Sequence, residues 1–387
     1  MFENNQNCRL IQPQAAYVHF PFCYSKCNYC DFNSYTGLEH LYQQYIEALI
    51  KEIEFQKVYN NQPLKSIYFG GGTPSIIQSD LLLSILFSIQ NKFGVDNTTE
   101  ITIEANPKTV DINSLKELRN GFNRISIGIQ SFDDKTLEFL GRPHNSQSAK
   151  SAFDDARKAG FENISVDLIY AVPEQNISKL KYDLESAIAL NPEHISIYEL
   201  SIEENTPIFD MLKRNDIKIP DEDIQIEMYD FIISFLTAKS YGHYEVSNFS
   251  KPTKKAIHNQ AYWNNFQYYG FGAGAVSYLG HNRAKRELSP QSYIYKIMSN
   301  KSAIIESEVL TPSQRIAESI MLGLRMIDGI DINKFNLMHD IDLLSHYEFV
   351  ISNLIDRKLI TISNGRIKTT HKGLLMLNEV AGEFINY

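Results

Sequence analysis

The sequence predicts an α/β protein that is built on a parallel β-sheet and carries a smaller, mostly helical module at its C-terminal end. Short β-rich runs alternate with longer helical patterns from the start of the chain to about Asn248. Such alternation is typical of parallel sheets with right-handed crossovers. Beyond Thr311 the pattern changes to successive helices and one hairpin. With 387 residues, the chain is long enough for two or three domains.

Six strand–helix units account for the first part of the chain. The expected strands are short runs rich in β-branched and aromatic residues, and they cover residues 16–19, 66–69, 100–104, 124–128, 165–169 and 194–199. The helical stretches between them include residues 41–57, 79–92, 146–159 and 177–190. A closed barrel of eight units would need more strands than the sequence offers before the pattern changes.

The rest of the chain divides into two further parts. Residues 242–280 are rich in Tyr, Phe, Asn and Gly. After Thr311 we expect helices at 313–326, 332–335 and 343–357, a hairpin of strands 359–363 and 366–369 around Asn364-Gly365, and a helix at 372–379. This order predicts a winged-helix-like module at 311–387. The expected domains are therefore 1–248, an aromatic-rich segment at 249–310, and 311–387.

Composition excludes several classes of function. The net charge of −9 argues against a general binder of nucleic acids or anionic membranes. Between Asp331 and Tyr387 acidic and basic residues nearly balance, whereas a DNA-binding winged helix needs a basic face, so we expect the module to serve packing. The N-terminus lacks the features of a signal peptide, and no apolar run is long enough to span a bilayer. We therefore expect a protein of the reducing cytoplasm.

Three of the four cysteines lie within eight residues, as Cys23, Cys27 and Cys30 in the pattern C-x3-C-x2-C. Thiolates suit iron–sulfur clusters and zinc. Three thiolates leave one iron of a four-iron cluster open, since such a cluster normally takes four cysteines. The alternative is a zinc site with Cys8 or His19 as the fourth ligand, although zinc knuckles more often show two separated C-x2-C pairs.

Other distinctive residues follow the expected strands. In barrels of parallel strands the chemistry lies at the C-terminal ends of the strands. The cysteine loop follows the first strand and Gly71, Gly72 and Thr73 follow the second. Glu104 ends the third strand, Gln130 follows the fourth, and Asp167 lies in the fifth. These motifs are therefore expected on one rim.

The cysteine motif resembles that of the radical S-adenosylmethionine (SAM) superfamily. The resemblance implies a partial (β/α)6 barrel and a [4Fe-4S] cluster held by Cys23, Cys27 and Cys30. It also implies that the amino and carboxylate groups of SAM chelate the fourth iron, and that an electron from the cluster splits the sulfonium to give a 5′-deoxyadenosyl radical.

The same resemblance implies roles for single residues. Gly71, Gly72 and Thr73 would receive the SAM amino group, where the alternative is a tight turn between strand and helix. Glu104 would hold the ribose or ammonium end, where the alternative is an ion pair at the rim. The other implied SAM contacts are Gln130, Arg142 on the carboxylate, Asp167 on a ribose hydroxyl, and Tyr17 beneath the cofactor; for each the alternative is a structural role.

Further motifs narrow the resemblance. Tyr17 to Cys23, Gly70 to Ser75, Glu104 to Pro107 and Gly128 to Phe132 are together similar to the oxygen-independent coproporphyrinogen III oxidase-like group, over nearly the whole chain. That group contains a dehydrogenase of heme biosynthesis and heme chaperones. The dehydrogenase has a fourth cysteine where this chain has Phe32, and a longer N-terminal extension than the short leader found here.

The sequence His258-Asn259-Gln260-Ala261-Tyr262-Trp263 matches the H-N-x-x-Y-W motif associated with heme binding in the chaperones. We expect His258 to ligate heme iron from a loop near the open C-terminal side of the barrel, with Tyr262 and Trp263 covering one porphyrin face. The alternative is a loop that packs on the barrel.

The resemblance thus implies a heme chaperone with a [4Fe-4S] cluster, SAM and heme as cofactors. Its implied partners are acceptor hemoproteins, including membrane-bound proteins of the respiratory chain, and it allows a homodimer. It implies a cytoplasmic protein that reaches the inner membrane only through its partners. Two alternatives are open: coproporphyrinogen III dehydrogenase, which Phe32 argues against, and a zinc-stabilised interaction protein, which leaves the SAM-site match unexplained.

Overall fold

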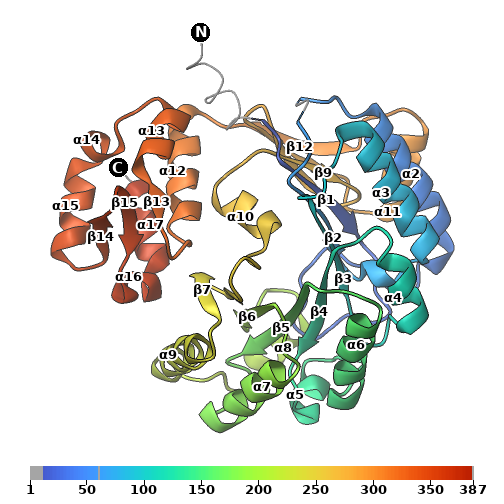
Figure 1. Cartoon of the computed structure of the whole chain (residues 1–387), viewed down its shortest axis with the longest axis horizontal. Coiled ribbons are helices and arrows are strands. Elements are labelled where there is room, and N and C mark those ends of the chain that lie inside the picture. Colours follow the sequence, from blue (N-terminus) through green and yellow to red (C-terminus); the bar gives the residue numbers. More distant parts are fainter. Residues whose placement is uncertain (1–11, 60–61, 386–387) are drawn as a thin grey trace.

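The computed structural model, which describes residues 12–59 and 62–385, contains one curved β-sheet with the order β12-β11-β10-β9-β1-β2-β3-β4-β5-β6-β8-β7 (Figure 1). All six expected strands form and pair in parallel in chain order. They are β1 (Ala15–Phe20), β2 (Ser66–Gly71), β3 (Glu100–Ala105), β4 (Arg124–Gln130), β5 (Ile164–Tyr170) and β6 (His194–Glu199).

Helices cover the outer face of these strands (Figure 1). They are α2 (Tyr42–Phe55), α3 (Ser79–Phe93), α4 (Ile112–Leu118), α6 (Ser146–Lys158), α7 (Ile177–Ala189) and α9 (Glu222–Ala238). The short helices α5 (Asp134–Phe139) and α8 (Pro207–Lys213) instead lie beside the cysteine loop. Side chains alternate between the two faces of a strand. In β4 the outward positions Ile125 and Ile127 join the core under the helices, while Ser126 and Gly128 face the hollow inside the sheet.

The segment 249–310 extends the sheet, so it is not separate from the barrel. The expected boundary between residues 248 and 249 falls inside β8 (Asn248–Ser250), which pairs with β6, and β9 (Tyr268–Phe271) pairs in parallel with β1. The other elements are β7 (Gly242–Glu245), α10 (Ile257–Trp263), β10 (Val276–Leu279), β11 (Asn282–Arg286), α11 (Pro290–Met298) and β12 (Ile304–Val309). The six predicted strands are thus the central strands of a wider β-sheet.

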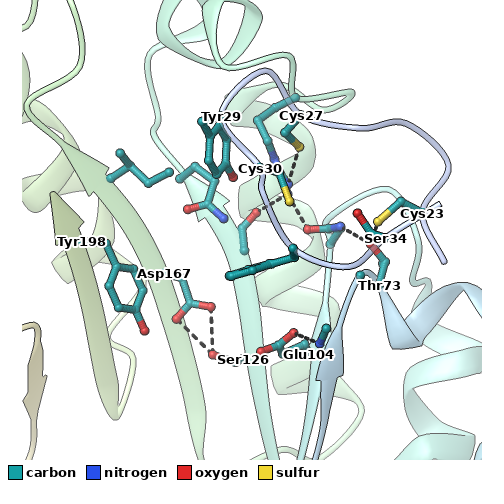
Figure 2. A pocket seen from close by; sticks show the side chains of 18 of the residues that line it. Cys23, Cys27, Tyr29, Cys30, Ser34, Thr73, Glu104, Ser126, Asp167 and Tyr198 are labelled. Atoms are coloured by element: carbon teal, nitrogen blue, oxygen red, sulfur yellow. Dashed lines mark hydrogen bonds between the residues drawn. The ribbon is translucent and has the colours of Figure 1, made fainter. Parts of the chain in front are cut away.

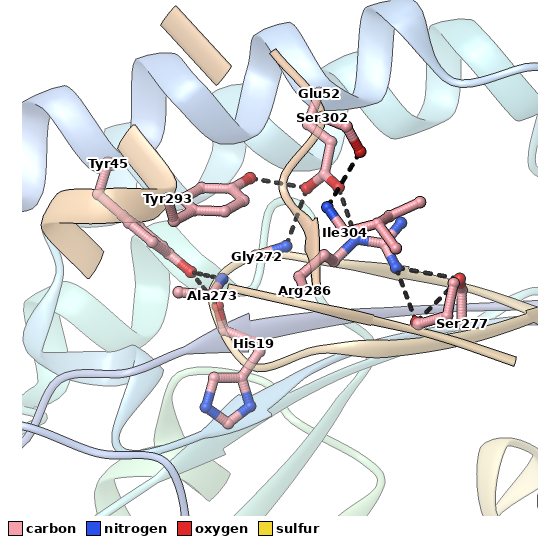
Figure 3. A network of polar contacts seen from close by, with 11 residues as sticks. His19, Tyr45, Glu52, Gly272, Ala273, Ser277, Arg286, Tyr293, Ser302 and Ile304 are labelled. Atoms are coloured by element: carbon pink, nitrogen blue, oxygen red, sulfur yellow. Dashed lines mark hydrogen bonds and ion pairs between the residues drawn. The ribbon is translucent and has the colours of Figure 1, made fainter. Parts of the chain in front are cut away.

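A buried ion pair fastens this extension to the barrel (Figure 3). Arg286 on β11 donates from Nε to Glu52 Oε1 on α2 at 2.6 Å, and both side chains are nearly inaccessible. The second oxygen of Glu52 accepts from Gly272 N at 3.0 Å and from the Tyr293 hydroxyl at 2.7 Å. Buried charges are tolerated when they are paired and fully hydrogen-bonded, as here.

The C-terminal module has its own apolar core and a small sheet of order β13-β15-β14. Its elements are α12 (Pro312–Gly323), β13 (Ile330–Asp331), α13 (Ile332–His339), α14 (Leu343–His346), α15 (Glu348–Asp356), β14 (Ile360–Ser363), β15 (Arg366–Thr369), α16 (His371–Leu375) and α17 (Leu377–Ile385). The expected hairpin around Asn364 is present.

Two helix predictions in this module were too simple. The expected helix 343–357 is divided at Tyr347, whose backbone leaves the helical region (φ −114°, ψ 28°) and whose ring packs on Phe384 at 5.3 Å. The expected helix 372–379 is divided at Met376 (φ −108°, ψ 30°). Tertiary packing overrides a continuous helical pattern in the first case. Among the described residues, no helix is long and apolar enough to cross a membrane.

Candidate functional site

A cavity of ≈ 780 Å³ lies inside the curved sheet and is lined by residues of all the central strands from β2 to β6. This volume is within the range of pockets that hold one or two small ligands. The cysteine loop and the loop after β2 form one end, at the C-terminal ends of the strands. Figure 2 shows Cys27 and Cys30 across the pocket from Asp167 and Glu104.

The cysteine loop follows β1 and is fixed at both ends by backbone hydrogen bonds. Cys23 N donates to Tyr35 O at 2.9 Å, and Asn28 N donates to Leu140 O at 3.0 Å. All three thiols of the motif line the cavity. The loop is thus shaped by its neighbours so that its sulfur atoms face one space.

Polar groups surround two of the thiols. Arg142 Nη1 donates to Cys27 Sγ at 3.3 Å, and Cys23 Sγ lies 3.6 Å from Thr73 Oγ1. Burial raises the pKa of the Cys23 and Cys30 thiols. A cationic neighbour such as Arg142 favours a thiolate, which is the form that binds metal.

The zinc alternative fits this geometry poorly. Within the described residues, no three His, Cys, Asp or Glu side chains are gathered closely enough to hold one metal ion. A four-iron cluster presents a different iron to each thiolate, so its ligands can stand farther apart. Both ring nitrogens of His19 are engaged, one with Tyr17 OH and one with Asn33 O at 2.9 Å each. Cys8 lies outside the described residues.

The glycine loop after β2 lies directly against the cysteine loop. Gly72 N donates to Phe20 O at 2.7 Å. A Cβ atom on Gly72 would meet Phe22 O at 2.5 Å and Cys23 Sγ at 3.0 Å, and Gly71 has a φ of +112°. Position 72 has no room for a Cβ atom, and position 71 has a backbone conformation that residues with side chains rarely adopt. Glycine meets both conditions, which explains why the motif has glycine at these positions.

Glu104 ends β3 and finds two donors. Tyr68 OH donates to its Oε1 at 2.6 Å and Gly71 N to its Oε2 at 3.1 Å. Burial, followed by the charge of Asp167, raises the pKa of Glu104 to about 7 despite these hydrogen bonds. The predicted acid at this position therefore lies in the cavity wall, where burial favours its protonated form.

Gln130 and Arg142 come together above β4. A bulge between Gly128 and Gln130 and a φ of +70° at Gln130 turn its side chain into the cavity, as bulges near functional sites often do. Arg142 Nη2 donates to Gly128 O at 2.7 Å and to Asn106 Oδ1. Its two terminal nitrogens are thus engaged with protein groups, and only the buried Nε has no partner. The predicted contact of Arg142 with the SAM carboxylate stays a prediction.

Asp167 and Tyr17 lie differently with respect to the cavity. Asp167 faces it, and both oxygens of its carboxylate accept from Ser126 Oγ at 3.0 Å. Burial raises the pKa of Asp167. Tyr17 does not line the cavity: it stacks on Tyr68 with ring centroids 6.2 Å apart, and Tyr68 provides the wall instead.

The structure places the H-N-x-x-Y-W motif on helix α10, at the opposite end of the barrel from the one expected. His258 Nδ1 lies 2.9 Å from the hydroxyl of Ser66, the first residue of β2. Its backbone N–H donates at 3.0 Å to Glu100, the first residue of β3. Helix α10 therefore closes the N-terminal end of the barrel, and Asn259 lines the cavity from that floor.

His258 is enclosed rather than open to a ligand. It is 2% exposed, stacks on Tyr68 at 4.9 Å, and its Nε2 lies 3.2 Å from Tyr262 OH. Trp263, expected on a porphyrin face, lies under the Arg325 guanidinium of the C-terminal module at 4.4 Å. Figure 1 shows α10 between the barrel and that module.

This burial predicts an effect of pH on stability. Burial, followed by the charge of Arg124, lowers the pKa of His258 to about 3 from 6.5. Below pH 6.5 the unfolded chain therefore binds a proton that the native state does not, so stability falls by up to ~1.4 kcal/mol per pH unit. Urea unfolding should show that the advantage of the parent protein over His258→Gln shrinks by about 2 kcal/mol from pH 7.5 to 5. A constant difference would contradict a buried neutral imidazole.

Sequence reasoning missed several residues of the site. They are Tyr68, Asn106, Arg124, Ser126, Ser196, Tyr198 and Asn259. Most occupy every second position of a strand: Arg124, Ser126, Gly128 and Gln130 all face inward from β4. Polar residues at a period of two in otherwise apolar strands are the signal that could have found them.

Comparisons with known proteins agree with this geometry. Residues 17–187 match the Radical SAM superfamily and residues 310–376 match the HemN C-terminal domain. The chain is 36% identical to the heme chaperone HemW of Lactococcus lactis, over 97% of this chain and 98% of the relative. It is 34% identical to the heme chaperone HemW of Bacillus subtilis, over 96% and 99%. Coproporphyrinogen III oxidase (HemN) of Escherichia coli has the same fold, with a TM-score of 0.83, 22% identity, and coverage of 99% of this chain and 92% of that chain.

Proposed function

Because the chain belongs to the HemW family of radical SAM proteins, we propose that it is a heme chaperone, which binds heme and passes it to acceptor hemoproteins. The observation that carries the proposal is the similarity to relatives named heme chaperone HemW over nearly the full length of both chains. The likeness to coproporphyrinogen III oxidase is at 22% identity and concerns the fold alone.

The second candidate function is that of coproporphyrinogen III dehydrogenase. One position of this chain argues against it. Phe32 lies where the resemblance to the dehydrogenase requires a further cysteine, and its side chain is 63% exposed at the edge of the cavity. This chain therefore presents an apolar ring to the cavity at that position.

The residues of the cavity fit a [4Fe-4S] cluster and SAM. Cys23, Cys27 and Cys30 would hold the cluster, and the Arg142 guanidinium beside Cys27 would balance the charge of the thiolates. The surface around Gly72, where a Cβ would collide with backbone, lets a ligand approach the main chain closely. When bound, the cluster and SAM supply one-electron chemistry. We propose that Gly71, Thr73 and Gln130, with the carboxylates of the walls, orient SAM.

We propose a positioning role for His258 instead of the ligand role expected from the sequence. Its two ring nitrogens face Ser66 and Tyr262, and one of these contacts would have to break before the ring could reach iron. The imidazole instead joins α10 to the start of β2. The motif thereby shapes the floor of the cavity and the joint with the C-terminal module.

The proposal is tested with protein purified and reconstituted without oxygen. It should contain iron and sulfide and should bind SAM. Titration with heme should give a Soret band whose intensity reaches a plateau when the protein is saturated. It should not convert coproporphyrinogen III to protoporphyrinogen IX in the presence of SAM and a reductant. Detectable decarboxylation would favour the dehydrogenase instead.

A variant separates the two candidates further. Phe32→Cys should leave heme binding as it is and should not create decarboxylase activity, because one thiol does not rebuild a substrate site. Heme transfer is followed by mixing the heme-loaded protein with an apo-hemoprotein and recording the shift of the Soret band to the acceptor. The acceptors we propose are hemoproteins, including membrane-bound ones of the respiratory chain.

A further inference from the structure

Arg124 lies at the deep end of the cavity. It is the first residue of β4, and the inward-facing positions run from Arg124 through Ser126 and Gly128 to Gln130. At ~3.3 Å per residue, Arg124 is about 13 Å below Gly128, the residue that Arg142 touches beside the cysteine loop. The cavity therefore extends well beyond the space next to the cysteines.

The guanidinium of Arg124 is buried and keeps unfilled donor positions. The residue is 2% exposed, and its Nε makes no hydrogen bond. Within residues 12–59 and 62–385, no ion pair and no hydrogen bond of its guanidinium is found. Burial alone would lower the pKa of Arg124, but the negative charge of Glu100 keeps that pKa above its ordinary value, so the guanidinium stays charged. A buried guanidinium that borders a cavity and has unfilled donor positions can donate to an anion in that cavity.

The acidic groups around Arg124 are engaged elsewhere. Glu100 accepts the backbone N–H groups of Ile257 and His258 at 3.0 Å each. Asp167 accepts from Ser126, and Tyr68 donates to Glu104. These groups act on Arg124 by charge at longer range without filling its donor positions.

Asn259 of the motif approaches the same place from below. Its neighbour His258 donates its backbone N–H to Glu100 at the start of β3, and β3 pairs with Arg124 of β4 two residues later, at Thr102. Asn259 lines the cavity, and its amide makes no hydrogen bond to the described part of the chain. A guanidinium and an amide N–H together present donors that suit the two oxygens of a carboxylate.

We propose that Arg124 and Asn259 form a carboxylate-binding subsite in the floor of the cavity, and that its ligand is a propionate of heme. The identification of heme rests on the function proposed above. The other buried guanidinium of the cavity, that of Arg142, is already engaged with Cys27, Gly128 and Asn106, so Arg124 is the one that offers unfilled donors to a carboxylate. The other carboxylate available to this cavity belongs to SAM.

The test compares heme with its dimethyl ester, which lacks both carboxylates, on cluster-loaded protein. Absorption titration should show that Arg124→Gln weakens heme binding at least ~10-fold, since hydrogen bonds to charged groups are the strong ones. The affinity for the ester should change less than about 2-fold, because the ester has no carboxylate that could accept hydrogen bonds from Arg124 and Asn259. Asn259→Ala, which removes no internal hydrogen bond and should fold normally, should weaken heme binding about 3-fold and spare the ester. Arg214→Gln, on the exposed surface, is the control.

Equilibrium dialysis with SAM forms the second arm. SAM affinity should be the same in the parent protein, Arg124→Gln and Asn259→Ala. If both variants lose SAM affinity and keep heme affinity, the carboxylate is that of SAM and the propionate assignment is wrong. If heme and its ester are weakened equally, Arg124 acts on the fold and the subsite is refuted. A parent protein that binds no heme refutes the proposed function as well, so the two failures are distinguishable.

Discussion

Replacing Cys27 with Ser should abolish the [4Fe-4S] cluster and heme transfer, yet leave much of the heme binding. Cys27 is the most buried of the three thiols and the one that Arg142 contacts. A serine hydroxyl does not ionise readily, so the cluster loses one of only three protein ligands. The floor of the cavity lies about 13 Å deeper along β4 and contains no residue of the cysteine loop. Iron and sulfide analysis, the Soret titration and the transfer assay measure the three quantities.

The matched control is Cys8→Ser, which removes the only cysteine outside the motif and should keep a full cluster. Two results would contradict this account. One is stoichiometric zinc without iron after preparation under nitrogen. The other is equal loss of heme binding and cluster in Cys27→Ser, because it would indicate a general folding defect.

Replacing Glu52 with Ala should destabilise the protein by about 3–5 kcal/mol, which is the usual cost of removing one partner from a buried ion pair. Arg286 would stay buried with its charge uncompensated, and Gly272 N and Tyr293 OH would lose their acceptor. Because these groups join α2 to β11, to α11 and to the residue that follows β9, the loss acts on the joint between the barrel and its extension (Figure 3). Urea unfolding followed by circular dichroism measures it.

The control for this variant is Glu185→Ala, which removes an exposed partner of Lys181 on α7. Surface pairs of this spacing contribute about 0.3–0.5 kcal/mol. Glu52→Gln keeps the shape of the side chain and tests the charge alone. A change below about 1 kcal/mol in Glu52→Ala would mean that water reaches Arg286 and replaces the carboxylate.

Part of the candidate site was predictable because its residues follow one another closely in the chain. The cysteines lie on one loop, and Gly71 and Gly72 follow a strand at a place where only glycine fits. Arg142 was predicted to hold the SAM carboxylate, but the sequence did not show that its Nη2 donates to both Gly128 O and Asn106 Oδ1. The role of Arg124 was missed because a lone arginine at the start of a strand looks like a surface residue.

The sequence alone determined the six central strands, the helices between them, the cysteine loop and the rim at the strand ends. These follow from local periodicity and from the rule that parallel strands bring their C-terminal ends together. Only the tertiary structure decided where residues 249–310 lie, because β9 pairs with β1 across some 250 residues of chain. That pairing, with the contacts of His258 to Ser66 and Glu100, carries α10 to the N-terminal end of the barrel. The closure entropy of a connection grows only slowly with its length, so a later helix can reach either end of a barrel at a similar cost. The order of elements along the chain therefore does not determine which end α10 covers.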